Sequence, residues 1–176
     1  MKNKIPTYVR SGTWECAYSL MRFVKAIEAM EEDDGLQLTP DFQRERVWTA
    51  KQQVAYIEHI LSGGESGKVI YLNNPNWNTR VTGEYAEMVC VDGLQRITAI
   101  RRFVLGEIQA HGYYYYELGK EWTGIINGGM RININDLPTK KAVLTWYLEM
   151  NGGGTPHTEE ELSWVRELLE KESAKG

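Results

Sequence analysis

The interpretation of this chain starts from the stretch Met88-Val89-Cys90-Val91-Asp92-Gly93-Leu94-Gln95-Arg96-Ile97-Thr98-Ala99-Ile100. The apolar residues before Asp92 are typical of a buried strand, and the apolar spacing after Gly93 predicts an amphipathic helix. A strand, a tight glycine turn and a helix N-terminus bring several backbone N–H groups and the positive end of the helix dipole to one point. The sequence therefore predicts an anion-binding turn at residues 92–96.

Arg96 strengthens this prediction. It falls in the first turn of the predicted helix, where a cation opposes the helix dipole at a cost of about 0.3–1 kcal/mol. A capping box, with Asp92 as the N-cap and Gln95 reaching back to it, explains those two residues without any ligand. It does not explain Arg96, which is favourable there if its planar guanidinium group holds a phosphate. Both interpretations of the turn stay open at this point.

The composition is that of a globular protein. The chain has 176 residues, of which 42% are hydrophobic and 25% charged, so we expect one domain over residues 1–176. A net charge of −4 argues against a protein that coats nucleic acid. Cys16 and Cys90 lie far apart in apolar surroundings, which predicts core thiols in a reducing cytosol. Without a membrane-length apolar run or a signal segment, we expect a cytoplasmic protein with no membrane partner.

Apolar spacing and turn residues predict a mixture of helices and short strands. The predicted helices cover residues 14–32, 94–105 and about 138–150, and two more begin in capping boxes at Thr49 and Thr158. The predicted strands cover residues 36–38, 69–72, 87–91, 113–116 and 130–134. This order lacks a β-α-β-α rhythm. It favours an α+β fold, with a small mixed sheet flanked by helices, over a doubly wound sheet.

Two other candidate motifs are weak. The segment from Ser62 to Val69 resembles a P-loop, but Ser62 replaces the first glycine and Val69 replaces the Mg²⁺-binding Ser or Thr. The segment also follows a predicted helix and precedes a predicted strand, which is the reverse of the required order. His59, His111 and His157 are scattered, so neither a zinc site nor an HNH-type nuclease centre is predicted. Of these, His157 follows a glycine-rich loop and is the histidine with the better chance of contacting a ligand.

The second informative stretch is Pro40-Asp41-Phe42-Gln43-Arg44-Glu45-Arg46-Val47-Trp48. Its apolar residues predict an ordered loop that holds Arg44 and Arg46 just before a helix N-terminus. Surface salt bridges with Glu45 or Asp41 are the favoured explanation of these arginines when the stretch is considered alone. Together with Arg96 the balance changes, because two arginine-bearing helix starts can converge on one polyphosphate.

Three segments of the chain together resemble the N-terminal domain of GmrSD-type restriction enzymes. That family carries an F-Q-R-x-x-V-W segment, a D-G-Q-Q-R segment and a late N-x-x-G-T-P-L-S-x-x-E-L segment. The matching residues here are Phe42-Gln43-Arg44 with Val47-Trp48, then Val91 to Arg96, then Asn151 to Pro156 with Glu161-Leu162. The resemblance spans about residues 36–165. The family is similar in fold to ParB and sulfiredoxin, where the matching turn also binds nucleotide phosphates, so the resemblance implies a ParB/sulfiredoxin-like fold.

The resemblance also implies nucleotide binding and, as in several relatives, NTP hydrolysis linked to DNA restriction or phage defence. By position, Gln43 and Arg44 match the first motif. The second motif is matched by Asp92, Gly93, Gln95 and Arg96. Leu94 replaces the first glutamine of D-G-Q-Q-R, which puts hydrolysis in doubt, and His157 stands where the family usually has leucine. Because the chain ends shortly after the last motif, we expect no C-terminal nuclease domain.

The resulting hypothesis is a nucleoside triphosphatase. The backbone N–H groups from Gly93 to Arg96 form a phosphate cradle, Arg96 and Arg44 neutralise charge, and Gln43 and Arg46 contribute from the first motif. Asp92 holds Mg²⁺ or orients the attacking water, and Gln95 positions that water, so Asp92, Gln95 and Arg96 are the catalytic candidates.

Two alternatives stay open. The first is a non-catalytic nucleotide- or DNA-binding module that regulates a larger restriction or defence protein, which the Leu94 substitution favours. The second is a ParB-like nuclease that acts directly on DNA. The acidic net charge and the lack of a carboxylate and histidine cluster count against this second alternative.

Overall fold

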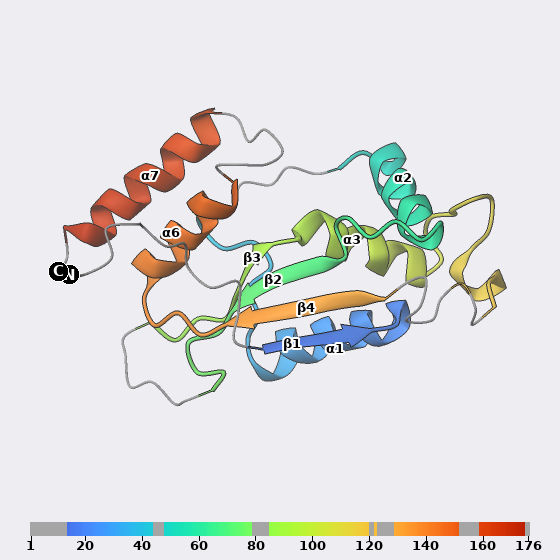
Figure 1. Ribbon diagram of the computed structural model, residues 1–176, viewed down its shortest axis with the longest axis horizontal. Helices are drawn as coiled ribbons and strands as arrows, with labels where there is room; N and C mark the ends of the chain where they lie inside the picture. Colours follow the sequence, from blue (N-terminus) through green and yellow to red (C-terminus); the bar gives the residue numbers. More distant parts are fainter. Residues whose placement is uncertain are drawn as a thin grey trace, which may run out of the picture.

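A four-stranded sheet flanked by helices forms the centre of the molecule (Figure 1). The computed structural model describes residues 14–43, 48–78, 85–119, 122, 129–151 and 159–174. The strands are β1 (Trp14–Tyr18), β2 (Val69–Asn73), β3 (Val89–Asp92) and β4 (Met130–Asn135). The helices are α1 (Leu20–Asp33), α2 (Ala50–Leu61), α3 (Leu94–Val104), α6 (Lys140–Asn151) and α7 (Glu159–Ser173), with a 3₁₀ turn η1 (Tyr115–Glu117). The predicted α+β class is confirmed.

The sheet is mixed, in the order β1-β4-β2-β3. The central strand β4 pairs antiparallel with β1 and parallel with β2, and β2 pairs antiparallel with β3. This topology places the beginnings of β2 and β4 at the same end of the sheet as the end of β3. The turn after Asp92 therefore lies next to the residues that lead into β2.

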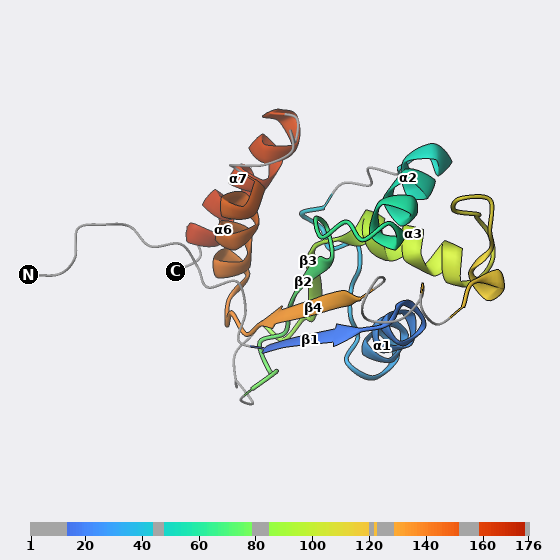
Figure 2. The same cartoon turned by 45° about the vertical axis from the view of Figure 1, so that its right-hand side comes forward.

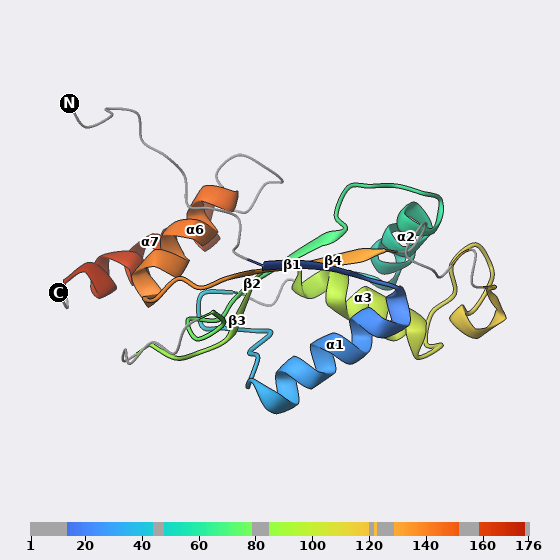
Figure 3. The same cartoon turned by 60° about the horizontal axis from the view of Figure 1, so that its bottom comes forward.

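Helices cover both faces of the sheet. On one face, β2, β3 and β4 contribute Ile70, Leu72, Cys90 and Ile132 to a core shared with α1, α2 and α3, and Figure 3 shows α1 and α3 on the same side of the sheet. On the other face, a second core joins β3 to the α6–α7 pair, which stands apart from the other helices in Figure 2. The apolar run in β3 is explained by this burial on both faces.

The prediction of a helix from residue 14 is wrong for its first five residues, which form β1. Trp14, Cys16 and Tyr18 are half-buried and alternate with exposed neighbours, which is the period of a strand. The pairing that stabilises this strand is with β4, far away in the sequence. Helix α1 begins only after Ser19.

Two other predicted strands are also wrong. Within residues 113–116, Tyr113 makes an isolated bridge to Ala110 and the chain then enters η1. The 3₁₀ turn η1 is stabilised by a hydrogen bond between near neighbours, because the Glu117 carboxylate accepts the backbone N–H of Tyr114 at 2.7 Å. Within residues 36–38, Gln37 alone bridges to β3.

The capping box predicted for the second helix is confirmed. The Thr49 backbone N–H donates to Gln52 Oε1 at 2.9 Å, and the Gln52 N–H donates to Thr49 Oγ1 at 3.3 Å. The strand at 69–72 and the helices near 94–105 and 138–150 also form within one or two residues of their predicted bounds. No helix of the described residues is long and apolar enough to cross a membrane.

Candidate nucleotide site at the start of α3

The turn between β3 and α3 requires a glycine. Gly93 is the N-cap of α3 with φ +124°, and its carbonyl accepts the first helical hydrogen bond, from Ile97 N at 2.9 Å. A Cβ atom at Gly93 would lie 2.5 Å from Ile70 Cδ1 in β2, a contact too short for any side chain. The predicted capping box at this turn is wrong, because Gly93 occupies the N-cap and Asp92 makes no capping hydrogen bond.

Asp92 instead forms an ion pair with Arg96, one helical turn away. Arg96 Nη2 donates to Asp92 Oδ2, and Nη1 donates to the carbonyl oxygens of Val69 at 2.7 Å and Gly67 at 3.3 Å. Burial alone would lower the pKa of Arg96. The nearby Asp92 carboxylate raises this pKa, and the net shift is upward. Arg96 is therefore a buried cation that links the start of α3 to the residues leading into β2.

Some donors at this turn have no acceptor in the part of the chain that the structure describes. Within the described residues, the backbone N–H groups of Gln95 and Arg96 and the Nε–H of Arg96 have no hydrogen-bond acceptor. The Asp92 side chain retains 42% of its accessible surface, against 15% for Arg96. The turn thus offers a set of N–H donors and a partly exposed carboxylate.

Two glutamines bind the first motif to the second. Gln43 Nε2 donates to the β3 carbonyl oxygens of Cys90 at 3.0 Å and Val91 at 2.9 Å. The Trp48 backbone N–H donates to Gln95 Oε1 at 2.8 Å. Both ends of the segment 43–48 are therefore held on the β3–α3 turn. Because both Nε2 protons of Gln43 are donated to β3, its side chain has only an acceptor left to offer.

The two residues just before this segment are held against α6 and α7. Phe42 is buried against Tyr147, with ring centroids 5.4 Å apart. Asp41 forms an ion pair with Lys140, and its carbonyl oxygen accepts a hydrogen bond from Trp164 Nε1 at 3.3 Å. Among the described residues, the ion-pair partner of Asp41 is thus Lys140 of α6.

The residues before β2 also contribute to this turn, which no sequence pattern predicts. The Tyr56 hydroxyl donates to the Gly67 carbonyl at 2.9 Å, next to Arg96, and burial raises the pKa of Tyr56. The segment rejected as a P-loop therefore does pack against the candidate phosphate turn. No sequence signal could have shown this contact, because its acceptors are backbone carbonyl oxygens.

A buried polar chain was also missed. Gln53, which is 2% exposed, donates to the Trp48 carbonyl at 3.3 Å and accepts a hydrogen bond from Arg102 Nη1 at 2.6 Å. The same Arg102 donates through Nε to Glu107 at 2.9 Å. A signal for Gln53 does exist in the sequence, since it stands at helical spacing with the buried Ile57 and Ile60.

The other arginines and the histidine considered from the sequence fall into two groups. Arg44, Arg46 and His157 lie outside the described residues. Arg101 pairs with Glu31 on α1 and Arg102 with Glu107, so within the described ranges Arg96 is the one arginine at the start of α3. The same ranges contain no group of three or more His, Cys, Asp or Glu residues that could hold a metal ion.

Residues 27–138 match the family model of the GmrSD restriction endonuclease N-terminal domain. The chain belongs to this family. The match includes the first two sequence motifs and the strands β2, β3 and β4, and it identifies the GmrSD N-terminal domain as a component of a restriction or phage-defence system. No curated protein and no solved structure matches the chain, so the similarity in fold to ParB and sulfiredoxin stays a prediction.

Proposed function

We propose that this GmrSD N-terminal domain binds a nucleoside triphosphate, with the phosphates at the N-terminus of α3, and hydrolyses it. One observation carries the proposal. The N–H groups of Gln95 and Arg96 have no acceptor within the described residues, and they stand beside a charged guanidinium group at the positive end of a helix. Such a set of donors favours a bound phosphate.

Arg96 can contribute to phosphate binding without losing its internal bonds. Its Nη groups hold Asp92 and the carbonyls of Gly67 and Val69, while its Nε–H is available to a phosphate oxygen. Arg44 and Arg46, which follow Gln43 in the first motif, add positive charge in the proposal. Gln43 is assigned to holding this segment on β3, because it has no amide proton left for a phosphate.

Asp92 is the carboxylate of the proposed site. One oxygen is bound to Arg96, and the other has no hydrogen-bond partner within the described residues, so it is free to bind Mg²⁺. Mg²⁺ is commonly held by one or two carboxylates together with substrate phosphates, which this donor set fits. Gln95 accepts a hydrogen bond through Oε1 from Trp48, and its Nε2 protons have no acceptor within the described residues. It can therefore donate to a water or a phosphate oxygen, and its proposed role is to orient the attacking water.

The alternative is a nucleotide-binding regulator without hydrolysis, which would act on DNA or on a larger restriction protein. Two observations favour it. Leu94 replaces the first glutamine of the family motif, and the Asp92 carboxylate is already neutralised by Arg96.

A binding experiment and a turnover experiment test these proposals. Each ribonucleoside triphosphate is titrated with Mg²⁺ while thermal unfolding is followed, and phosphate release is then assayed. A nucleotide at 100 times its Kd should raise the stability by about 2.7 kcal/mol. Arg96→Lys, which keeps the charge but loses the planar fork, should weaken binding at least tenfold. Arg101→Lys is the matched control, since Arg101 is a paired arginine on the same helix outside the turn.

The outcomes separate the candidates. Binding with phosphate release that Arg96→Lys diminishes supports the hydrolase. Binding without release supports the regulator. If no nucleotide raises the stability, both nucleotide proposals are rejected, and nicking of supercoiled plasmid DNA would then favour the ParB-like nuclease.

A further inference from the structure

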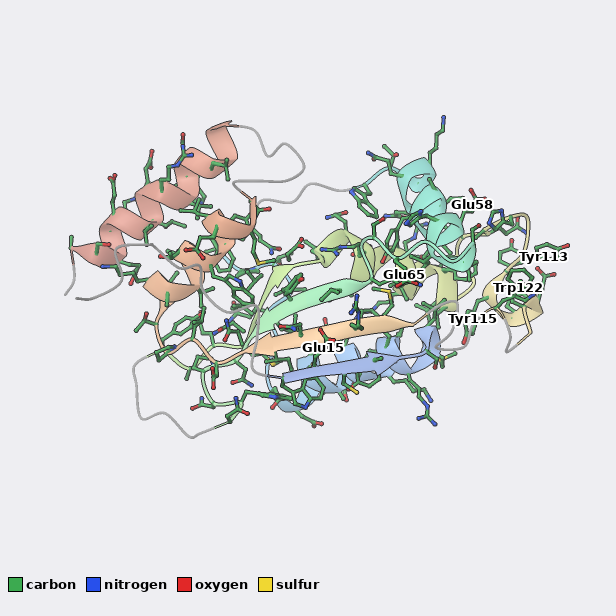
Figure 4. All side chains as sticks on the ribbon, viewed as in Figure 1. Glu15, Glu58, Glu65, Tyr113, Tyr115 and Trp122 are labelled. Carbon is green, nitrogen blue, oxygen red and sulfur yellow. The ribbon has the colours of Figure 1, made fainter. Side chains whose placement is uncertain are left out.

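The segment 105–122 exposes an unusual share of the large apolar side chains. Of the five large hydrophobic residues that are exposed in the described part of the chain, four lie in this segment and the fifth is Met21 on α1. Figure 4 shows Tyr113 and Trp122 at the end of the molecule far from α6 and α7. We name as the aromatic surface the residues Leu105, Tyr113, Tyr114, Tyr116 and Trp122.

The backbone beneath this surface is firmly anchored. Ala110 and Tyr113 exchange two backbone hydrogen bonds of 3.0 Å each, and between them His111 has φ +50°, a conformation that costs a non-glycine residue about 1–2 kcal/mol. Contacts to α2 hold it there. The His111 N–H donates to the Glu58 carboxylate at 2.9 Å, and its Nε2 shares a hydrogen bond of 3.1 Å with the Ser62 hydroxyl.

Of the tyrosines in this segment, Tyr113 and Tyr116 are exposed, whereas Tyr114 and Tyr115 are half-buried. Tyr115 packs inward against Phe103, with ring centroids 5.8 Å apart. Tyr114 and Tyr116 stack on each other at 5.3 Å and 11°, and Tyr116 is 72% exposed. A strained and anchored backbone that displays aromatic rings to solvent is preorganised for binding, and exposed apolar patches of this kind mark interaction sites.

The net charge around the aromatic surface is negative in the part of the chain that the structure describes. The carboxylates of Glu58, Glu107 and Glu117 all belong to or contact this segment. Glu107 forms an ion pair with Arg102, which also bonds to Gln53, so these two charges cancel. The negative charge is that of Glu58 and Glu117, which accept backbone N–H groups. Acidic surroundings repel the phosphates of nucleic acid and attract cations, and a guanidinium group stacks well on tyrosine faces.

We propose that the aromatic surface docks a partner protein through a segment that carries arginine side chains. The stacked rings receive the guanidinium planes and the surrounding carboxylates pair with their charge. The proposal is independent of nucleotide binding, because it uses the opposite end of α3.

Fluorescence polarisation with defined probes tests the proposal. The probe is a fluorescein-labelled peptide of alternating arginine and proline, compared with its glutamate counterpart and with an oligothymidylate of similar length. The double variant Tyr113→Ser/Tyr116→Ser should lose at least tenfold in affinity for the arginine peptide. Met21→Ser, which removes an exposed apolar side chain from outside the aromatic surface, should leave that affinity unchanged.

Three outcomes overturn the proposal. One is unchanged arginine-peptide affinity in the double variant while its thermal melt matches the original protein. Another is tighter binding of the oligothymidylate, which would identify a nucleic-acid surface. The third is a dimer in sedimentation that the double variant dissociates, which would identify a second copy as the occupant.

Discussion

The two ends of α3 use their side chains in opposite ways. At its start, the polar side chains of Gln43, Gln95 and Arg96 point inward and hold the backbone. At its end, the backbone of residues 105–119 is held by turn hydrogen bonds and by contacts to α2, and aromatic side chains point outward. The difference shows that the side chains of the family motif at residues 92–96 serve mainly to hold the backbone of their own turn. Within the described residues, the donors without an acceptor at the start of α3 are mostly backbone N–H groups, whereas the other end exposes side chains.

The largest expected effect comes from breaking the turn at the start of α3. Gly93→Ala forces a side chain onto a backbone at φ +124° and into Ile70, which is fully buried and cannot move aside. We expect a loss of about 2–4 kcal/mol in the free energy of unfolding, measured with urea. Gly35→Ala is the control, because Gly35 has φ +66° but open space around its Cα. Equal losses in both variants would contradict the close approach to Ile70.

The second prediction concerns Cys90 in β3, close to the same turn. It measures the free energy of unfolding as a function of pH and needs no substitution in the turn. Burial raises the pKa of Cys90 to about 12, with a further contribution from Asp92. An exposed thiol titrates near 8.5, so the folded state holds its proton over a pH range in which the unfolded state loses it. The contribution of Cys90 to the free energy of unfolding should be fully present below about pH 8. The free energy of unfolding should then fall by about 2 kcal/mol between pH 8 and 10.

The control for this titration removes the thiol. Cys90→Ala should flatten the decline between pH 8 and 10, whereas Cys16→Ala, at a half-buried position, should keep it. A decline of the same steepness in Cys90→Ala would show that another group is responsible.

A smaller effect is expected where the two motifs join. Gln43→Leu leaves the carbonyl oxygens of Cys90 and Val91 without their side-chain donor, at a cost of about 1.5 kcal/mol. Gln37→Leu is the matched control, because Gln37 also lies beside β3 but bonds to it through its backbone and has an exposed side chain. If the two variants have the same free energy of unfolding, the hydrogen bonds from Gln43 to β3 do not stabilise the fold.

The smallest effect is expected at the other end of the helix. Tyr113→Ser/Tyr116→Ser removes two exposed rings and should change the free energy of unfolding by less than about 0.5 kcal/mol. Tyr115→Ser is the contrasting variant, since this ring packs on Phe103 and its loss should be easily measured. A large loss in the double variant would mean that the displayed rings stabilise the fold, and the contrast between the two ends of α3 would disappear.

Local patterns predicted those parts of the fold that depend on local chemistry. The capping box at Thr49 and the strand and helix on either side of Gly93 follow from neighbouring residues. The strand β1 could not be found in this way, because its stabilising partner β4 is more than a hundred residues away in the sequence. A single-sequence pattern contains no record of that pairing.

In the candidate site, too, the features set by neighbouring residues were predictable and the contacts with distant residues were not. The sequence located Asp92, Gln95 and Arg96 on one turn, but their partners were not predictable. Arg96 bonds to carbonyl oxygens of the segment before β2, and any residue type carries such an oxygen. The roles of these residues toward a nucleotide stay proposals, and the experiments above test them.

The central position of β4 has a consequence for how the chain matures. During synthesis, β1 and β2 leave the ribosome well before the strand that must lie between them. At about 5–20 residues per second, β1 waits on the order of ten seconds as an unpaired edge. An unpaired edge of this kind is open to aggregation, and a nascent chain interrupted before residue 130 would never acquire the middle of its sheet.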